Sequence, residues 1–234
     1  MRTAVVFGAS GQVGMPMLDR LRDAGWRVFA VSRTPRAEQP GLVWVQGDLA
    51  APGALPREPD LIASCGPLDL FAEWYARTSL DCPRVVAFGS TSIDAKRGSA
   101  DADERALALR LREGEQRLFE RASAVGAHVT VLRPTLIYGT GRDQSLSRIV
   151  AIARRFGRVV LPRGATGLRQ PVHAHDLADA AFATVGREAS HGQVYALPGG
   201  ETLTYREMVR RTLAALSSRP PMHEVPSGVF NLML

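Results

Sequence analysis

The sequence predicts an α/β protein, a doubly wound parallel sheet with a small C-terminal substrate lobe. Short strands and longer helices alternate from residue 3 onward, which is the pattern of βαβ units. The strands are near-continuous apolar runs, as expected when helices cover both faces of a sheet. With 234 residues, the chain is long enough for one large domain, or for one domain with a small addition.

The first part of the chain is expected to form the sheet. Each expected strand is a short run rich in Val, Ile, Leu, Phe or Ala and is bounded by Gly, Pro or Asp. These strands are 3–8, 26–31, 42–46, 60–64, 84–89 and 128–133. Helices are expected between them at 12–24, 68–79 and 102–125. Asp101, followed by Glu104, is expected to cap the third helix.

The alternation changes after Pro134. A basic helix is expected at 143–156, a second helix at about 176–186 with Asp176 as its N-cap, and a strand at 193–197. Thr204 and Glu207 form a capping box that begins a helix ending near residue 216.

These patterns divide the chain into two parts. Residues 1–138 are expected to form the sheet domain, completed by a strand near 193–198. The remaining segments, 139–192 and 199–234, are expected to form the small lobe, and we expect this lobe to be truncated at its C-terminus.

Composition excludes several classes of protein. Apolar residues make up 45% of the chain and charged residues 22%, which excludes a disordered chain or a collagen-like repeat. No apolar run reaches the roughly 18 residues of a membrane-spanning helix, and we expect no signal peptide. Cys65 and Cys82 are too few for a disulfide framework. We expect a cytoplasmic protein with reduced thiols and no membrane partner.

The basic residues are distributed unevenly. Lys plus Arg is 29 against 23 Asp plus Glu, a formal net charge of +6, and Lys96 is the only lysine. Residues 142–169 hold seven arginines and one acid, Asp143, so this segment carries the whole excess. A solvated basic face, a site for a small anionic substrate and a nucleic-acid surface are the three explanations. The arginines lack the regular interleaving of aromatic residues with which proteins stack on bases, so we expect no nucleic-acid partner.

A glycine-rich loop joins the first strand to the first helix. Gly8, Gly11 and Gly14 follow the spacing G-x-x-G-x-x-G. A tight turn, the close approach of a pyrophosphate and the packing of helix on strand each need a residue without a Cβ atom. The amides at the start of the helix would then face the phosphates. At this place in the chain the loop predicts a dinucleotide cofactor, and a plain tight turn is the alternative.

The end of the second strand indicates which nicotinamide cofactor is bound. An NAD site has a carboxylate there, which accepts a hydrogen bond from a ribose hydroxyl. This sequence has Arg33 instead, with Arg36 nearby. A guanidinium binds a phosphate with two hydrogen bonds, so we expect NADP, with NAD as the second choice.

Two later strand ends complete the expected cofactor site. Asp48, after the third strand, is placed to accept a hydrogen bond from the adenine amino group, and the end of the fourth strand should pass the cofactor ribose. The expected cofactor-binding residues are Gly8, Ser10, Gly11, Gln12, Val13, Gly14, Arg33, Asp48, Leu49, Ser64, Cys65 and Gly66.

Five motifs follow one another along the whole chain. They are 8–14 (GASGQVG), 47–49 (GDL), 88–92 (FGSTS), 132–139 (LRPTLIYG) and 170–178 (QPVHAHDLA). In this combination the chain resembles the extended short-chain dehydrogenase/reductases, which include nucleoside-diphosphate-sugar epimerases and dehydratases. The resemblance implies an NAD(P)-binding Rossmann domain with a small C-terminal substrate lobe. It also implies a small-molecule substrate, which is anionic or nucleotide-linked.

The catalytic pair of this family is absent. The resemblance implies a Tyr-x-x-x-Lys pair on the helix after the fifth strand, where the tyrosine exchanges a proton with the substrate. The only lysine, Lys96, follows Ser92 by four residues, and no tyrosine lies within 102–125. When Glu115 is matched to the acid that follows the pair, Leu107 and Leu111 occupy its two positions. The chain therefore resembles atypical members that keep the cofactor fold without the pair.

A substitute catalytic set lies at the end of the fifth strand. Thr91 or Ser92 could orient a substrate oxygen, and Lys96 could act as proton donor or electrostatic partner. The alternative is a hydroxyl-rich strand end beside a solvated lysine. 

Arg142, Arg169 and His173 are expected to contact an anionic substrate, and the other five arginines of 142–169 are expected to be surface residues. His173 and His175 lack a third ligand at suitable spacing, so we expect no metal. Two functions stay open. One is an NADP-dependent oxidoreductase or nucleotide-sugar-modifying enzyme, and the other is a non-catalytic NADP-binding sensor or assembly protein. A homo-oligomer is compatible with either.

Overall fold

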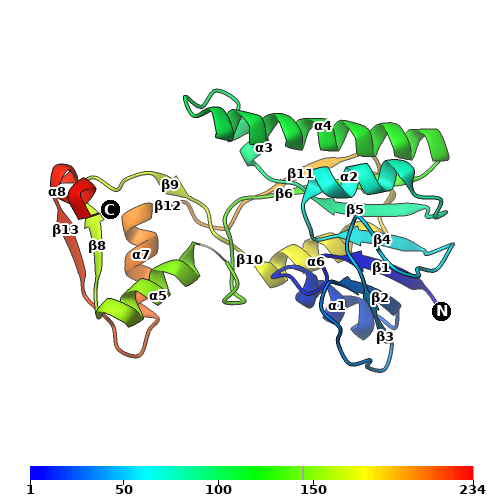
Figure 1. Ribbon diagram of the computed structural model, residues 1–234, viewed down its shortest axis with the longest axis horizontal. Helices are drawn as coiled ribbons and strands as arrows, with labels where there is room; N and C mark the ends of the chain where they lie inside the picture. The colour runs from blue at the N-terminus through cyan, green and yellow to red at the C-terminus, as the bar shows by residue number, and fades with distance from the viewer. Residues whose placement is uncertain (144, 234) are drawn as a thin grey trace. The chain divides into compact units, whose positions relative to one another are not determined.

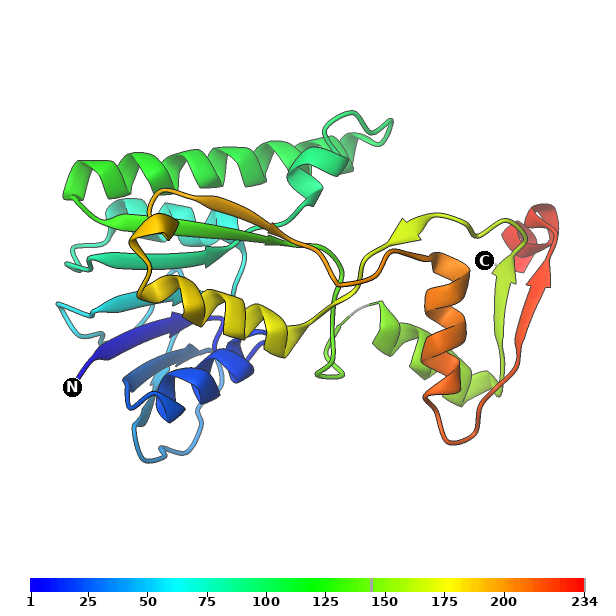
Figure 2. The same cartoon turned by 180° about the vertical axis from the view of Figure 1, so that it is seen from behind.

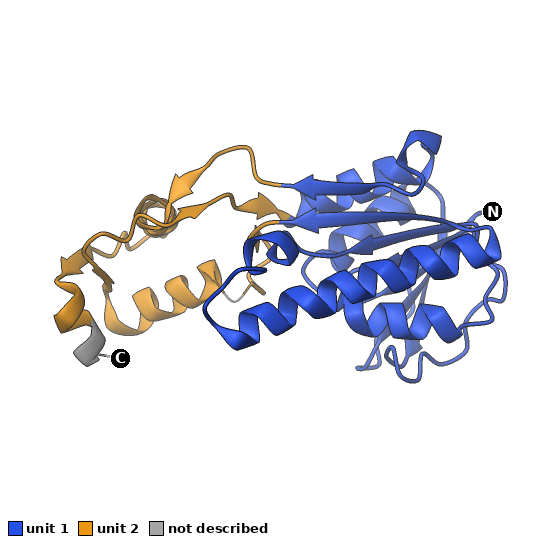
Figure 3. Cartoon of the chain, turned by 90° about the horizontal axis from the view of Figure 1, so that it is seen from above, with its two compact units in different colours: residues 1–134, 174–197 blue, residues 135–173, 198–234 orange. Residues whose placement is uncertain are grey.

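The chain forms two compact units, which Figure 3 colours separately. The computed structural model describes residues 1–143 and 145–233. The first unit consists of Met1–Pro134 and Ala174–Leu197, and the second of Thr135–His173 and Pro198–Leu234.

The first unit contains a seven-stranded sheet in the order β11-β6-β5-β4-β1-β2-β3 (Figure 1). All of its neighbouring strands are parallel. From β1 the strand order runs outward in both directions, which confirms the doubly wound fold. The strands are β1 (Thr3–Phe7), β2 (Arg27–Ser32), β3 (Leu42–Gln46), β4 (Leu61–Ser64), β5 (Arg84–Phe88), β6 (His128–Pro134) and β11 (Val194–Leu197).

Helices pack in two pairs against this sheet. The helix α1 (Gly14–Asp23) packs beside α6 (Ala174–Val185), and α2 (Leu68–Arg77) packs beside α4 (Ala102–Val125), as Figures 1 and 2 show from opposite sides. Apolar side chains of the strands are buried against α2 and α4. The rings of Phe7 and Trp74, for example, lie 4.3 Å apart between centroids.

Predicted caps fix the ends of two helices. The carboxylate of Asp101 accepts hydrogen bonds from the amides of Asp103 at 2.8 Å and Glu104 at 3.4 Å, at the start of α4. The hydroxyl of Thr204 accepts one from Glu207 at 3.1 Å, at the start of α7 (Tyr205–Ala214). Both caps were expected from the sequence. Each gives a hydrogen-bond partner to amides that have none within the helix.

The second unit is built around two helices. The helix α5 (Leu146–Phe156) and α7 share an apolar core that includes Ile149 and Met208. Three pairs of short strands surround them: β7 (Ile137–Tyr138) with β10 (Val172–His173), β9 (Leu168–Arg169) with β12 (Leu203–Thr204), and β8 (Val159–Pro162) with β13 (Met222–Val225). The other short elements of the described chain are α3 (Ser92–Ala95), a 3-10 turn (Glu188–Ser190) and α8 (Ser227–Met233).

The boundary between the two units differs from the one expected from the sequence. The first segment of the second unit is 135–173 rather than 139–192, because α6 belongs to the first unit. The apolar face of α6 packs beside α1, and an ion pair of 2.6 Å joins Asp179 to Arg20. Since α6 follows β10 directly and begins at Ala174, Asp176 lies in its first turn. The expectation that Asp176 is the N-cap was therefore wrong.

Candidate functional site

The glycine loop after β1 forms a tight turn against the end of β4. The amide of Gly11 donates to the carbonyl of Gly8 at 2.9 Å, and Gly8 has a φ of +64°. A Cβ atom on Gly8 would lie 2.6 Å from the carbonyl carbon of Cys65, and one on Gly14 would lie 2.2 Å from the oxygen of Gly8. The loop, the first turn of α1 and the end of β4 therefore approach one another at distances that only glycine permits.

Polar atoms without partners lie around this loop. Within the part of the chain that the structure describes, the side-chain oxygens of Gln12 and Ser64 are buried and form no hydrogen bond. A buried polar atom without a partner is costly in a folded protein, and a bound polar group would give these two oxygens a partner. Cys65 differs, because burial of its thiol raises its pKa to about 12 although part of the residue is exposed. A thiol with this pKa is neutral at pH 7 and is a poor nucleophile.

A cavity of about 340 Å³ lies at the carboxyl ends of β1 to β4. Its lining brings together five of the expected cofactor-binding residues: Gly8, Arg33, Asp48, Leu49 and Gly66. The cavity lies where the strand order reverses between β1 and β4. Open parallel sheets bind their ligands at this position.

The charged groups of this cavity are held by local hydrogen bonds. Ser32, the last residue of β2, donates through its hydroxyl to the carbonyl of Thr34 at 2.9 Å, and the exposed Arg33 lies in the turn that this bond forms. The carboxylate of Asp48 accepts from the amides of Ala51 at 3.0 Å and Ala50 at 2.8 Å. These hydrogen bonds hold the pKa of Asp48 below its usual value, with the bond from Ala51 contributing most, and the charge of Arg33 lowers that pKa further.

Sequence reasoning missed the contribution of α2 to the cavity. Leu70, Glu73 and Arg77 also line it, and their spacing places them on one face of the helix. The Nε of Arg77 donates to the carbonyl of Glu73 at 3.2 Å. The signal was present in the sequence as i, i+3, i+7 spacing. Arg36, in contrast, lies over the ring of Trp44, 5.0 Å from its centroid, and does not line this cavity.

The three catalytic candidates lie at and after the end of β5. The hydroxyl of Thr91 donates to the carbonyl of Pro134 at 3.2 Å. Ser92 begins α3, and the amide of Lys96 donates to its carbonyl at 3.0 Å, one turn later. The ammonium of Lys96 pairs with Glu104 at 3.1 Å. Thr91 and Lys96 therefore already have protein partners.

A buried ion pair joins α4 to β6 near these residues. Arg133 donates to the two oxygens of Glu115 at 2.8 and 2.5 Å, and to Asp94 at 3.1 Å. The Glu115 side chain is 7% exposed and that of Arg133 is 21% exposed. The hydrogen bonds that Arg133 donates to Glu115 raise the pKa of Arg133. On the same helix, Leu107 and Leu111 pack into the apolar core.

The three substrate candidates lie in or beside the strands and loops of the second unit. Arg169 donates to the carbonyl of Leu168 at 2.8 Å, and its guanidinium lies 5.7 Å from the ring centroid of Tyr205. The ring of His173 meets that of Tyr138 edge-on at 5.2 Å. Arg142 is exposed.

A cavity of the second unit, between α5 and α7, is lined by residues other than the expected substrate contacts. Arg142, Arg169 and His173 are not among the residues that line it. Arg154, expected to be an ordinary surface residue, lines this cavity. Arg154 is exposed, as expected, but it shares a helix face with Leu146, Val150 and Ala151, which line the cavity as well.

Among residues 1–143 and 145–233, no group of three or more His, Cys, Asp or Glu is arranged to hold a metal ion. Within the same residues, no helix has both the length and the apolar character needed to cross a membrane.

Comparison with known proteins identifies the fold. No family model matches the sequence. The structure of MoeE5 in complex with UDP-glucuronic acid and NAD superimposes with a TM-score of 0.75 and 20% identity, covering 97% of this chain and 86% of that one. The UDP-N-acetylglucosamine 4-epimerase from Bacillus cereus gives 0.75 and 13%, with the same coverage. The chain therefore has the same fold as MoeE5 and this epimerase. The motifs that carried the resemblance thus predicted the correct fold.

A curated relative matches part of the chain. Erythronate-4-phosphate dehydrogenase from Pseudomonas aeruginosa is 36% identical over 115 residues, or 48% of this chain. The matched segment spans 28% of the length of that relative. The same values are found for the enzyme from Pseudomonas paraeruginosa.

Proposed function

We propose that the first unit binds a nicotinamide dinucleotide and prefers NADP to NAD. The observation that carries this proposal is the cavity at the carboxyl ends of β1 to β4, bordered by Gly8 of the glycine loop and by Arg33. An NAD site would have a carboxylate at the position of Arg33. A guanidinium there would instead bind the 2′-phosphate of NADP with two charge-assisted hydrogen bonds.

Each expected cofactor residue has a distinct role in this proposal. The amides of Gln12, Val13 and Gly14, with Ser10 beside them, would face the pyrophosphate at the start of α1. The amide of Gly11 already donates to Gly8, so Gly11 would instead allow the close approach of the pyrophosphate. The partnerless oxygens of Gln12 and Ser64 would bind polar groups of the cofactor. Asp48 and Leu49 would contact the adenine. When bound, the cofactor supplies hydride transfer, and the protein positions and polarises the substrate.

We further propose that the protein is an atypical oxidoreductase or nucleotide-sugar-modifying enzyme of the epimerase/dehydratase type. Its substrate would be small and anionic, with Arg142, Arg169 and His173 as contacts. MoeE5, which shares the fold, was solved with UDP-glucuronic acid and NAD, and the partial relative is named for a phosphorylated acid. Thr91 and Ser92 would orient a substrate oxygen, and Lys96 would donate the proton after leaving Glu104. Reduced thiols at Cys65 and Cys82 support a cytoplasmic location.

A second candidate function is a non-catalytic NADP-binding sensor or assembly protein. The packing of Leu107 and Leu111 in the core favours it. These leucines stand where the family pattern has its tyrosine and lysine, and neither side chain can transfer a proton.

Cofactor consumption separates the two candidates. Purified protein would be incubated with NADPH and a panel of small carbonyl acids, and with NAD or NADP and UDP-sugars, and products would be measured by absorbance and mass spectrometry. The enzyme proposal predicts turnover that Lys96→Gln lowers about 100-fold, as expected for loss of a general acid, and that Arg97→Gln leaves unchanged. Cofactor binding with no turnover on any substrate would favour the sensor. Absence of cofactor binding would refute both.

A further inference from the structure

A cavity of about 800 Å³ lies within the second unit between α5 and α7. Its size is in the range of small-molecule sites. The helix α5 contributes Leu146, Val150 and Ala151, and α7 contributes Met208 on the facing side. Val150 lies four residues after Leu146 and Ala151 is its neighbour, so these three apolar side chains share one face of α5.

Four charged side chains also line this cavity: Asp143, Arg154, Glu201 and Arg211. Asp143 is held at the start of α5, where its carboxylate accepts from the amides of Ser145 and Ser147 at 3.0 Å each and from the hydroxyl of Ser147 at 2.7 Å. Burial alone would raise the pKa of Asp143, but these hydrogen bonds together lower it. The carboxylate therefore stays ionised and is held by the helix N-terminus.

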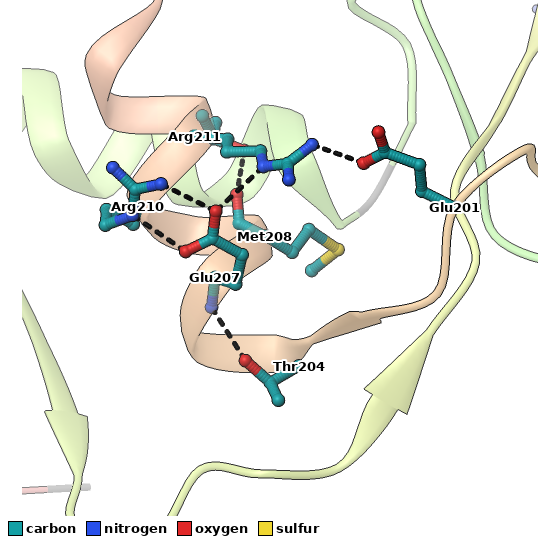
Figure 4. A network of polar contacts seen from close by, with 7 residues as sticks. Glu201, Thr204, Glu207, Met208, Arg210 and Arg211 are labelled. Atoms are coloured by element: carbon teal, nitrogen blue, oxygen red, sulfur yellow. Dashed lines mark hydrogen bonds and ion pairs between the residues drawn. The ribbon is translucent and has the colours of Figure 1, made fainter.

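Arg211 is neutralised by two acids, as Figure 4 shows. Its Nε donates to Glu207 at 2.8 Å, and its Nη1 donates to Glu201. Glu207 also accepts two hydrogen bonds from Arg210, at 2.7 and 2.6 Å. Because Arg211 is paired with both Glu207 and Glu201, its positive charge is already balanced within this network.

Arg154 is the exception among the four. Within the described residues it forms no hydrogen bond, ion pair or ring contact. The cavity therefore combines an apolar lining with one uncompensated positive charge at the last turn of α5.

We propose that this cavity binds an amphipathic monoanion, whose apolar body lies between α5 and α7 and whose single carboxylate pairs with Arg154. Charge complementarity selects one negative charge, since a diphosphate would need a second free cation. Burial of the apolar body supplies affinity, and the guanidinium supplies orientation. This inference goes beyond the proposed function, because the proposed substrate contacts Arg142, Arg169 and His173 do not line this cavity.

The experiment uses 2-naphthoate as the anionic probe, 2-naphthalenemethanol as its neutral analogue, and UDP as the nucleotide. Each is titrated calorimetrically into the full chain without cofactor. Arg154→Gln should weaken 2-naphthoate at least about 10-fold, since a hydrogen bond to a charged group is lost, and should leave 2-naphthalenemethanol unchanged. Arg148→Gln, on the exposed side of the same helix, is the matched control and should change neither. Ala151→Trp should remove both by filling the cavity.

Several results would overturn the inference. Failure of the wild type to bind 2-naphthoate would do so, as would equal losses in Arg154→Gln and Arg148→Gln. Displacement of 2-naphthoate by UDP, with Arg154→Gln also weakening UDP, would make the cavity a nucleotide site instead. Because the cofactor cavity lies in the first unit, NADPH titration of the same variants reports on the proposed function separately. Unchanged NADPH binding beside absent 2-naphthoate binding would refute this inference alone.

Discussion

The ion pair between Glu115 and Arg133 allows a quantitative test of how the first unit is held together. Glu115→Gln removes the negative charge but keeps the shape of the side chain, so Arg133 loses its main partner in a buried position. Breaking a fully buried pair costs about 3–5 kcal/mol. The Arg133 side chain is 21% exposed and keeps Asp94, which is itself 73% exposed. We therefore expect a smaller loss of about 2–4 kcal/mol.

Tryptophan fluorescence during urea unfolding measures this loss. All three tryptophans, Trp26, Trp44 and Trp74, lie in the first unit, so the signal reports on that unit. A loss of about 2–4 kcal/mol corresponds to a melting temperature lower by about 4–16 °C for a domain of this size. Glu113→Gln, on an exposed position of the same helix, is the control and should stay within about 0.5 kcal/mol of wild type.

A double variant separates the pair from the packing around it. Glu115→Leu with Arg133→Met replaces both charges by apolar groups, and we expect it to be more stable than Glu115→Gln because no unpaired charge stays buried. If Glu115→Gln lies within about 0.5 kcal/mol of wild type, or the double variant is the less stable of the two, the electrostatic reasoning is refuted.

Three further outcomes are expected. Gly11→Val should remove cofactor binding and leave the first unit folded, because a Cβ atom on Gly11 lies 3.0 Å from the oxygen of Gly8. Gly14→Ala should lower the melting temperature, because a Cβ atom on Gly14 would lie 2.2 Å from the same oxygen. Calorimetry measures both effects, and normal cofactor binding by Gly11→Val would contradict the loop assignment. Iodoacetamide at pH 8 should alkylate neither Cys65 nor Cys82 in the folded chain, because burial raises the pKa of each to about 12, and rapid labelling seen by mass spectrometry would disprove this. Hydrogen bonds from Arg210 and Arg211 lower the pKa of Glu207 from 4.5 to about 2. The stabilisation that the Glu207 carboxylate provides is therefore present above pH 4.5 and is lost as the pH falls to 2. A plot of unfolding free energy against pH should be flatter for Glu207→Gln than for wild type in this window, and parallel plots would contradict the prediction.

Long, strongly patterned elements were predictable from the sequence. The strands of the sheet, the long helix α4 and its cap at Asp101 follow from local patterns that burial on two faces imposes. The short strands of the second unit, such as β7 and β8, show no period and were missed. The place of α6 in the first unit depends on contacts with α1, which are distant in sequence.

More of the candidate cofactor site than of the second unit's cavity could be predicted from the sequence. Gly8, Arg33 and Asp48 each follow a strand end, and parallel strands bring such positions to one edge of a sheet. Arg154 is one arginine among seven in its segment. Only the folded unit shows that Arg211 is neutralised and Arg154 is not.

The central claim is that the first unit binds a nicotinamide dinucleotide with Arg33 on its 2′-phosphate. Titration of NADPH and NADH into wild type, Arg33→Ala and Arg36→Ala tests it most directly. We expect wild type to bind NADPH more tightly than NADH, and Arg33→Ala to lose about 1.5–3 kcal/mol, or about 10- to 100-fold, for NADPH alone. Arg36→Ala is the control, because Arg36 lies over Trp44 away from the cavity, and should bind NADPH as wild type does. Equal affinities, or tighter NADH, would contradict the role of Arg33, and failure of wild type to bind either cofactor would contradict the central claim itself.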